Sequence, residues 1–250
     1  MKPRDPFAQA VEMTTAAYDQ IAENYAERNE DLLPHWKSRL DEFVDMVHAA
    51  RERHPIAALG RPSGDESLEE YLQLEPVLDA GCGHGRDARA LAGCGLDVLA
   101  IDLSQGMLDA AGERTPRRMP KGSVRYAIMD LRSLDLPQRS VRGVWCSASL
   151  LHVPLRTAPR AIAELARVAK PESPVVIFLK QRQDEIKERF VPYESPTGDA
   201  PQRYYAYYTV DEAVELVESA SLRTLNVSVV PHRNPELSPP WISILATKPL

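Results

Sequence analysis

Apolar residues recur at helical spacing near the start of the chain. One such face predicts a helix over residues 11–29, and it consists of Val11, Tyr18, Ile21, Ala22 and Tyr25. A second stripe predicts a helix over residues 36–53, and it consists of Trp36, Leu40, Phe43, Val44 and Val47. Residues 54–70 are rich in Pro, Gly and acids, which predicts a linker with a short helix near residues 68–72.

The pattern changes after residue 76, where short apolar runs alternate with amphipathic segments. The runs predict strands over residues 77–80, 97–101, 124–129, 141–146 and 174–179. The amphipathic segments between them predict helices over residues 86–92, 106–113 and 155–169. Ser104 is suited to cap the second of these helices. This alternation indicates an α/β fold with a doubly wound parallel sheet covered on both faces.

The last third of the chain has a different order of elements. An aromatic run at residues 204–208 precedes a helix over 210–219 that Thr209 is placed to cap. Two β-rich segments follow, at 225–230 and 241–247, with no helix between them, so we expect an antiparallel hairpin at the sheet edge. The prediction is a mostly parallel seven-stranded sheet with an antiparallel edge strand.

These elements divide the chain into three parts. We expect an N-terminal helical lid over residues 1–53, a linker over 54–73 and a ligand-binding core over 74–250. Within the core, residues 181–208 follow the fifth strand and are placed to form a substrate cap.

Composition narrows the classes of function. The chain has 250 residues, 44% of them hydrophobic, and a net charge of −6, which disfavours a protein that binds nucleic acid mainly through its electrostatic field. No apolar run approaches the roughly 18 residues of a membrane helix, and the first residues do not resemble a signal peptide. The three cysteines are widely spaced, which indicates reduced thiols and a cytoplasmic protein. No CxxC or HExxH pattern supports a metal site.

A glycine-rich turn at residues 81–85 follows the first predicted strand of the core. Ligands of open parallel sheets bind at such turns. Residues 83–88 satisfy G-x-G-x-x-A, and Asp102 follows about 20 residues later, which leaves a nicotinamide or flavin enzyme open. Two further acids, Asp79 and Asp130, stand at the ends of their strands. Three acids at successive strand ends favour a ligand with a positive centre and hydroxyl or amino donors.

Four stretches of the core, in order, resemble the motifs of class I S-adenosylmethionine (SAM) methyltransferases. Residues 77–85 (VLDAGCGHG) look like the first motif and residues 99–107 (LAIDLSQGM) like the second. Residues 129–137 resemble the third motif, and residues 144–153 with 164–171 resemble the fourth and the helix beyond it. The helix around Tyr18-Asp19 is similar to the N-terminal helix of the same family. The resemblance implies a Rossmann-like methyltransferase fold and SAM as the cofactor.

The resemblance also implies roles for individual residues. The backbone of Gly81 and Gly83 would follow the cofactor, with Asp79 near its amino group and Asp102 on both ribose hydroxyls. The remaining cofactor contacts that it implies are Leu103 and Met107 on the adenine, Asp130 and Leu131 on the adenine edge, the Ser147 carbonyl near the amino group, and Tyr18, Tyr25 and Arg28 over the carboxylate. From their spacing alone, Tyr18 and Tyr25 equally fit core aromatics.

His152 follows the fourth strand and is the candidate catalytic base. A lone His there equally fits a hydrogen-bonded structural role, and methyl transfer from a sulfonium often needs only positioning and desolvation. Arg182, Tyr205 and Tyr207 are the candidate substrate-binding residues. In a strand, Tyr205 and Tyr207 would face one way and Tyr204 and Tyr208 the other.

We therefore expect a SAM-dependent methyltransferase acting on an oxygen or nitrogen of a small molecule, with no membrane partner. An RNA-modifying methyltransferase is the first alternative. A NAD-dependent oxidoreductase and a non-catalytic SAM-binding protein are the others.

Overall fold

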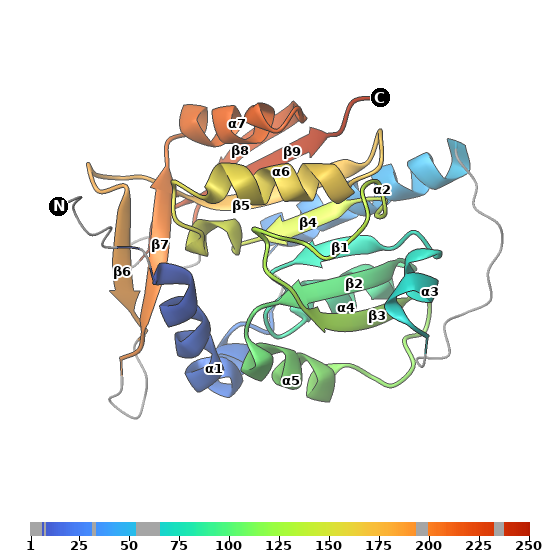
Figure 1. Ribbon diagram of the computed structural model, residues 1–250, viewed down its shortest axis with the longest axis horizontal. Helices are drawn as coiled ribbons and strands as arrows, with labels where there is room; N and C mark the ends of the chain where they lie inside the picture. Colours follow the sequence, from blue (N-terminus) through green and yellow to red (C-terminus); the bar gives the residue numbers. More distant parts are fainter. Residues whose placement is uncertain (1–6, 8, 32–33, 54–65, 194–199, 233–237) are drawn as a thin grey trace.

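A nine-stranded sheet forms the centre of the molecule (Figure 1). The computed structural model describes residues 7, 9–31, 34–53, 66–193, 200–232 and 238–250. The helices are α1 (Ala10–Arg28), α2 (Pro34–Arg53), α3 (Leu68–Leu72), α4 (Arg86–Gly93), α5 (Gln105–Arg114), the short 3-10 helix η1 (Leu150–His152), α6 (Ala158–Val168) and α7 (Val210–Ser219). The strands are β1 (Val77–Ala80), β2 (Asp97–Asp102), β3 (Ser123–Ile128), β4 (Val144–Ser147), β5 (Pro174–Gln181), β6 (Glu188–Pro192), β7 (Gln202–Tyr208), β8 (Arg223–Val230) and β9 (Trp241–Thr247).

The sheet has the predicted doubly wound topology. Strands β3, β2, β1, β4 and β5 lie side by side in that order and are all parallel. The C-terminal hairpin extends this row at its edge, because β9 pairs antiparallel with β5 and β8 pairs antiparallel with β9. The antiparallel strand, β9, thus lies between β5 and the outermost strand β8. These seven strands confirm a mostly parallel sheet, but the antiparallel strand lies one place inside the edge and not at the edge, where it was predicted.

Two further strands form an arm that the sequence pattern only half predicts. β7 contains the aromatic run and pairs in parallel with the last two residues of β5, while β6 pairs antiparallel with β7 along its whole length. No strand is predicted at β6, because its alternation is weak and its residues are only partly buried. Residues 194–199, which complete the predicted cap, lie outside the described residues.

Side chains on both faces of the sheet are apolar, as expected for a layer buried between helices. On β5, Val175, Ile177 and Leu179 pack with α6 and α7, whereas Val176 and Phe178 pack with α2 and α4. Two helices have the N-cap residues that were predicted. The Ser104 hydroxyl accepts the Met107 N–H at the start of α5, and Thr209 forms a capping box with Glu212 at the start of α7.

The two N-terminal helices have different places. The predicted apolar stripe of α2 is buried against the sheet, and the Trp36 ring stacks on Phe178 with 4.1 Å between ring centroids. α1 instead lies across the carboxyl ends of the strands, together with the arm of β6 and β7 (left in Figure 1). Asp19 attaches α1 to the start of α5 by accepting the Ser104 hydroxyl at 2.6 Å and the Gly106 N–H at 3.0 Å. Of the two helices, α1 lies at the carboxyl ends of the strands, and its role as a lid stays a prediction.

The linker prediction is tested only in part. α3 occupies the predicted position and begins with a capping box between Ser67 and Glu70. Residues 54–65 lie outside the described residues. Among the described helices, none is long and apolar enough to cross a membrane.

Candidate functional site

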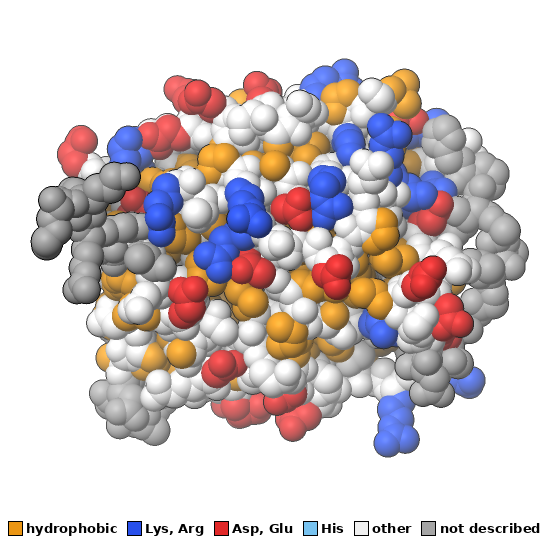
Figure 2. Space-filling view, in the orientation of Figure 1, with side chains coloured by type: hydrophobic (Ala, Val, Ile, Leu, Met, Phe, Trp, Pro, Cys, Tyr) orange, Lys and Arg blue, Asp and Glu red, His pale blue; other side chains and the backbone are white. Residues whose placement is uncertain are grey.

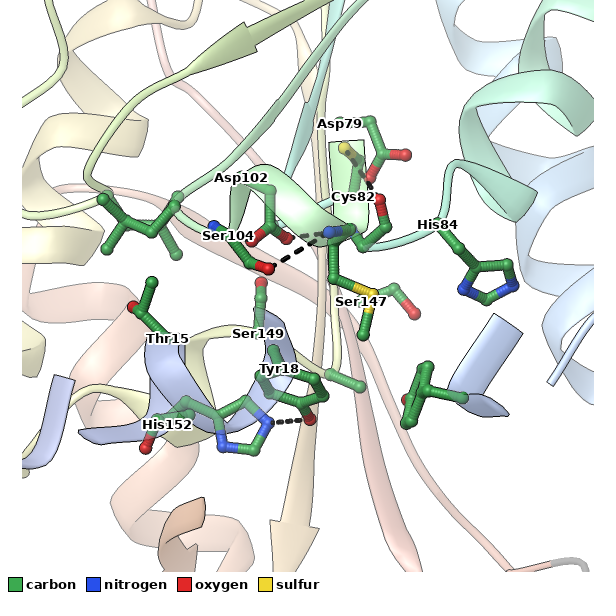
Figure 3. Close-up of a pocket in the computed structure, with 18 of the residues that line it drawn as sticks. Thr15, Tyr18, Asp79, Cys82, His84, Asp102, Ser104, Ser147, Ser149 and His152 are labelled. Atoms are coloured by element: carbon green, nitrogen blue, oxygen red, sulfur yellow. Dashed lines mark hydrogen bonds between the residues drawn. The ribbon is translucent and has the colours of Figure 1, made fainter. Parts of the chain in front are cut away.

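A cavity opens at the carboxyl ends of β1, β2 and β4, underneath α1 (Figure 3). Its walls come from the glycine loop after β1, the loops after β2, β3 and β4, and the inner face of α1. These five segments are far apart in the sequence. They meet here because the carboxyl ends of parallel strands lie at one edge of the sheet.

The glycine loop is shaped by close approaches that exclude side chains. Gly81 has φ +77°, and a Cβ on it would lie 2.1 Å from Cβ of Ser149. Gly85 has φ +76° and is the N-cap of α4, where a Cβ would lie 2.3 Å from the Tyr126 hydroxyl. At both positions, only glycine adopts the positive φ without strain and also leaves room for the neighbouring side chain. The loop therefore presents bare backbone to the cavity.

Asp102 holds this loop from the end of β2. One carboxylate oxygen accepts the Gly83 N–H and the other accepts the Ser104 N–H, each at 2.9 Å. Burial raises the pKa of Asp102, and these N–H donors oppose the rise. Each oxygen keeps further lone pairs for hydroxyl donors of a ligand.

Asp79 is the most isolated carboxyl group of the site. It is 1% exposed, and its Oδ2 has no hydrogen-bond partner among the described residues. Burial and the neighbouring charge of Asp87 raise the pKa of Asp79 well above its usual range. A buried carboxylate without a partner is costly, so this position favours a ligand that brings a donor or a positive charge.

Asp87, the second residue of α4, is by contrast paired through both carboxylate oxygens. It accepts Nε1–H of Trp145 at 2.8 Å and Nε–H of Arg86 at 2.7 Å. Burial alone would raise the pKa of Asp87, but the Arg86 charge and these donors outweigh burial and lower it. Arg86 also donates to the backbone carbonyl of Asn29, which joins the glycine loop to the end of α1.

Asp130, in the loop after β3, forms a fork with Arg132. The Arg132 guanidinium donates to both carboxylate oxygens, at distances between 2.7 and 3.1 Å. Burial opposes ionisation, but the Arg132 hydrogen bonds outweigh it and lower the pKa of Asp130. Asp130 is therefore an ionised acceptor at the cavity wall, next to Leu131.

Tyr18 and His152 form a hydrogen-bonded pair on the α1 side of the cavity (Figure 3). Nδ1 of His152 lies 2.6 Å from the Tyr204 carbonyl, which can only accept, so Nδ1 carries the proton. Nε2 then accepts the Tyr18 hydroxyl at 2.9 Å. Burial lowers the pKa of His152 to about 3. Both ring nitrogens are thus occupied in a neutral imidazole.

Arg203 on β7 contacts Tyr18 but is not among the residues that line the cavity. Its guanidinium carbon is 5.6 Å from the ring centroid of Tyr18, 4.9 Å from that of Tyr193 and 5.4 Å from that of Tyr205. Nη1 is 3.4 Å from the Tyr18 hydroxyl. The side chain is 9% exposed, and its Nε has no hydrogen-bond partner among the described residues.

The structure brings most of the predicted site residues to this one cavity. Those that line it are Tyr18, Tyr25, Asp79, Gly81, Gly83, Asp102, Leu103, Met107, Asp130, Leu131, Ser147 and His152. Their individual contacts to a ligand stay predictions, because no ligand is present.

Four predicted residues are not part of the lining. Arg28 lies over the ring of Tyr193, 5.8 Å from its centroid. Arg182 forms an ion pair with Glu212 at the start of α7, so it supports that helix. Tyr207 receives a hydrogen bond from Arg189. Tyr205 packs against His152, with ring centroids 4.7 Å apart, and so stands one layer behind the wall.

Several residues of the site have no counterpart in the sequence prediction. Arg86 and Asp87 follow the glycine loop directly, and this position in the sequence could have identified them as residues of the site. Arg203 shares a strand face with Tyr205, so strand alternation could have identified it. Trp36, which donates to the Ser147 hydroxyl at 2.6 Å from α2, carries no local signal, because only the tertiary fold brings it there.

Comparisons with known proteins agree with this geometry. A family model described as a methyltransferase domain matches residues 77–172. A malonyl-[acyl-carrier protein] O-methyltransferase from Erwinia pyrifoliae is 30% identical over 184 residues, which cover 73% of this chain and 67% of that protein. The enzyme of the same name from Serratia marcescens is 36% identical over 153 residues, which cover 60% of this chain. The chain spans only 56% of the Serratia protein's length.

The fold also matches solved structures. Magnesium protoporphyrin IX methyltransferase from Synechocystis PCC 6803, solved with bound SAM, superposes with a TM-score of 0.60. The two share 16% sequence identity, and the match covers 94% of this chain and 97% of that one. At this identity the similarity concerns the fold alone.

Proposed function

Because the chain belongs to the class I SAM-dependent methyltransferases, we propose that it transfers a methyl group from SAM to a small-molecule acceptor. The names of the Erwinia and Serratia relatives favour oxygen as the atom methylated. Cys82, Cys94 and Cys146 form no disulfide, which supports the cytoplasmic location that we propose.

One observation carries this proposal: three carboxylates from three strand ends meet around a bare glycine loop. Asp79, Asp102 and Asp130 all line the cavity. SAM offers a cationic amino group, two ribose hydroxyls and an adenine amino group, so each carboxylate has a matching donor. The unpartnered Oδ2 of Asp79 is the strongest sign of fit, because a bound ammonium or ordered water would relieve its burial.

The apolar part of the cofactor also finds a surface. Leu103 and Met107 follow Asp102 and line the cavity beside it, where a flat adenine ring would pack. Arg86, at the end of the glycine loop, is the lining cation available to a carboxylate of the cofactor. When bound, SAM supplies an electrophilic methyl group on a sulfonium.

The chain's own task is then to position the acceptor and exclude water. We propose that His152 is a positioning residue: its Nε2 fixes the Tyr18 hydroxyl, and its pKa of about 3 makes it a poor proton acceptor. α1, attached to α5 through Asp19, covers the cavity and keeps solvent from the methyl group.

The alternatives have less support. A pyrophosphate of NAD would bring neither a hydrogen-bond donor nor a positive charge to the unpartnered Oδ2 of Asp79. For an RNA substrate, a continuous basic surface would be expected. On the face drawn in Figure 2, Lys and Arg side chains stand among Asp and Glu side chains.

The test is titration calorimetry with SAM, with S-adenosylhomocysteine (SAH) and with NADH. We expect SAM and SAH to bind, and Asp102→Ala to weaken both at least about tenfold, or 1.4 kcal/mol. Asp109→Ala is the matched control, since Asp109 is an exposed acid on α5 that accepts a hydrogen bond from Gln105; the variant should bind like wild type.

Binding of NADH without SAM would refute the cofactor assignment. Binding of SAM with no SAH released in an acceptor screen would favour the non-catalytic alternative.

A further inference from the structure

His84, in the glycine loop after β1, is a buried side chain whose hydrogen-bonding groups are unused (Figure 3). It is 4% exposed and lines the cavity. Neither Nδ1 nor Nε2 has a hydrogen-bond partner among the described residues. A neutral imidazole carries one N–H donor and one acceptor nitrogen, and leaving both unpaired in a buried position is costly. A ligand group that pairs with this ring would remove part of that cost.

Glu30, just after α1, comes close to His84 without forming a hydrogen bond to it. Its Oε2 lies 3.6 Å from Nε2 of His84, which is beyond hydrogen-bond distance, and its Oε1 accepts from Arg89 at 2.5 Å. Burial, and after it the charge of Arg86, lower the pKa of His84 to about 4. The ring is therefore neutral near pH 7, and its contact with Glu30 is not an ion pair there.

Two further donors line the same end of the cavity. Arg86 donates through Nε to Asp87 and through Nη1 to the Asn29 carbonyl, and its Nη2 makes no hydrogen bond among the described residues. The Tyr25 ring lies edge-on to His84, with 5.9 Å between ring centroids. Burial raises the pKa of Tyr25, so its hydroxyl keeps its proton. A guanidinium, a phenol and an imidazole together suit a carboxylate.

Asp79 indicates which carboxylate reaches this end. Its unpartnered Oδ2 is matched to the amino group of SAM. The charge of Arg86 acts on both Asp79 and His84, so Arg86 lies within electrostatic reach of both. The amino group and the carboxylate of SAM are bonded to the same carbon, so a cofactor whose amino group is at Asp79 has its carboxylate close by.

We propose that His84 is a cofactor-binding residue, and that an N–H of its neutral ring donates to the carboxylate at the amino-acid end of SAM, beside Arg86. This inference rests on the proposed function, and it adds a residue that selects a cofactor with an intact amino-acid end.

Binding should then change the protonation of the ring. A carboxylate next to an imidazole favours its charged form, so the pKa of His84 should rise when the cofactor binds. The charged groups that already act on the ring are Arg86, Asp87 and Arg89 on α4 and Glu30 after α1. The ligand-free protein contains all four, so it is the reference for their effect.

The experiment compares two stable ligands that differ at this end. SAH contains the amino acid, whereas 5′-methylthioadenosine has the same adenosine and a thioether without it. NMR of the His84 ring is recorded between pH 7 and pH 4.5 with each ligand, and the spectrum of His84→Gln assigns the signal. We expect SAH to raise the pKa of His84 by at least about one unit and 5′-methylthioadenosine to leave it unchanged. The amino group of SAH would lower this pKa, so a rise reports the carboxylate.

Calorimetry at pH 7 tests the same contact by substitution. His84→Leu should weaken SAH at least about tenfold and 5′-methylthioadenosine less than about twofold, and His84→Gln, which keeps an N–H donor, should lose less. His48→Gln is the matched control. His48 lies on α2, where its Nε2 is 3.4 Å from the Cys94 carbonyl, and it is not among the lining residues. This variant should bind both ligands like wild type.

Two kinds of result would overturn the assignment. The pKa of His84 could stay unchanged with SAH or rise equally with 5′-methylthioadenosine, or His84→Leu could weaken both ligands by the same factor. If His84→Leu does not fold, the NMR comparison on wild type still decides. Failure of wild type to bind either ligand would instead refute the proposed function, so the two failures are distinguishable.

Discussion

The neutrality of His152 makes the stability of the protein depend on pH in a defined direction. The folded pKa of about 3 lies below the ordinary value of 6.5. Each pKa unit corresponds to about 1.4 kcal/mol, so protonating this ring in the folded state costs about 5 kcal/mol. Because the folded pKa is depressed, the full stability is present above pH 6.5. This stability is lost as pH falls from 6.5 toward 3, because over that range the unfolded chain binds a proton at His152 and the folded chain does not.

At pH 5, the depressed pKa of His152 should therefore lower the free energy of unfolding by about 2 kcal/mol relative to neutral pH. His152→Asn removes the titrating group, and its amide N–H can still donate to the Tyr204 carbonyl. We expect the variant to lose about 2 kcal/mol less than wild type between pH 7 and pH 5. At roughly 2–4 °C per kcal/mol for a chain of this size, the two thermal midpoints should converge by about 4–8 °C.

Two measurements check this reasoning. Thermal unfolding at pH 7, 6 and 5 compares the slopes of wild type and variant, and NMR follows the His152 ring proton directly. His84, whose pKa burial lowers to about 4, should still contribute to the slope in both proteins. A His152 ring that titrates near pH 6, or equal slopes in both proteins, would refute the claim that His152 is held neutral, and with it the argument against a general base.

Two other substitutions test the walls of the cavity. Gly81→Ala would place a Cβ 2.1 Å from the Ser149 Cβ at φ +77°, so chemical denaturation should report a loss of at least about 2 kcal/mol; Gly112→Ala, which meets nothing within 4 Å on α5, should instead gain about 0.5–1 kcal/mol. Because the folded pKa of Asp79 is raised, its ionisation costs stability as pH rises above 3.8. Asp79→Asn should therefore raise the thermal midpoint of the ligand-free protein at pH 7 and weaken SAM about tenfold in calorimetry; a lower midpoint would contradict this account of Asp79.

The core of the fold was predictable because its signals are local and repeated. Each parallel strand is a short apolar run, and each ends in a turn or an acid, as at Asp79 and Asp102. Parallel strands place their carboxyl ends at one edge, so the meeting of these acids follows from topology alone. The helix caps at Ser104 and Thr209 were readable for the same local reason.

The features that could not be predicted depend on contacts between segments that are far apart in the sequence. The place of α2 against the sheet was not predictable, because an apolar stripe shows that a helix is buried but not which surface covers it. β6 forms by pairing with β7, and its own residues are only half-buried. Arg182 was expected at the substrate, yet Glu212, 30 residues away in sequence, holds it at α7.

The distribution of charge gives the two walls of the cavity different tasks. Asp79 and Asp102 lie on the wall formed by the sheet, where burial makes their ionisation costly until a donor or cation arrives. On the opposite side of the cavity, Tyr18 and His152 form a hydrogen-bonded pair in which the imidazole is neutral. A sulfonium bound in the cavity is therefore drawn toward the carboxylates, so the charge distribution orients the cofactor before any bond changes.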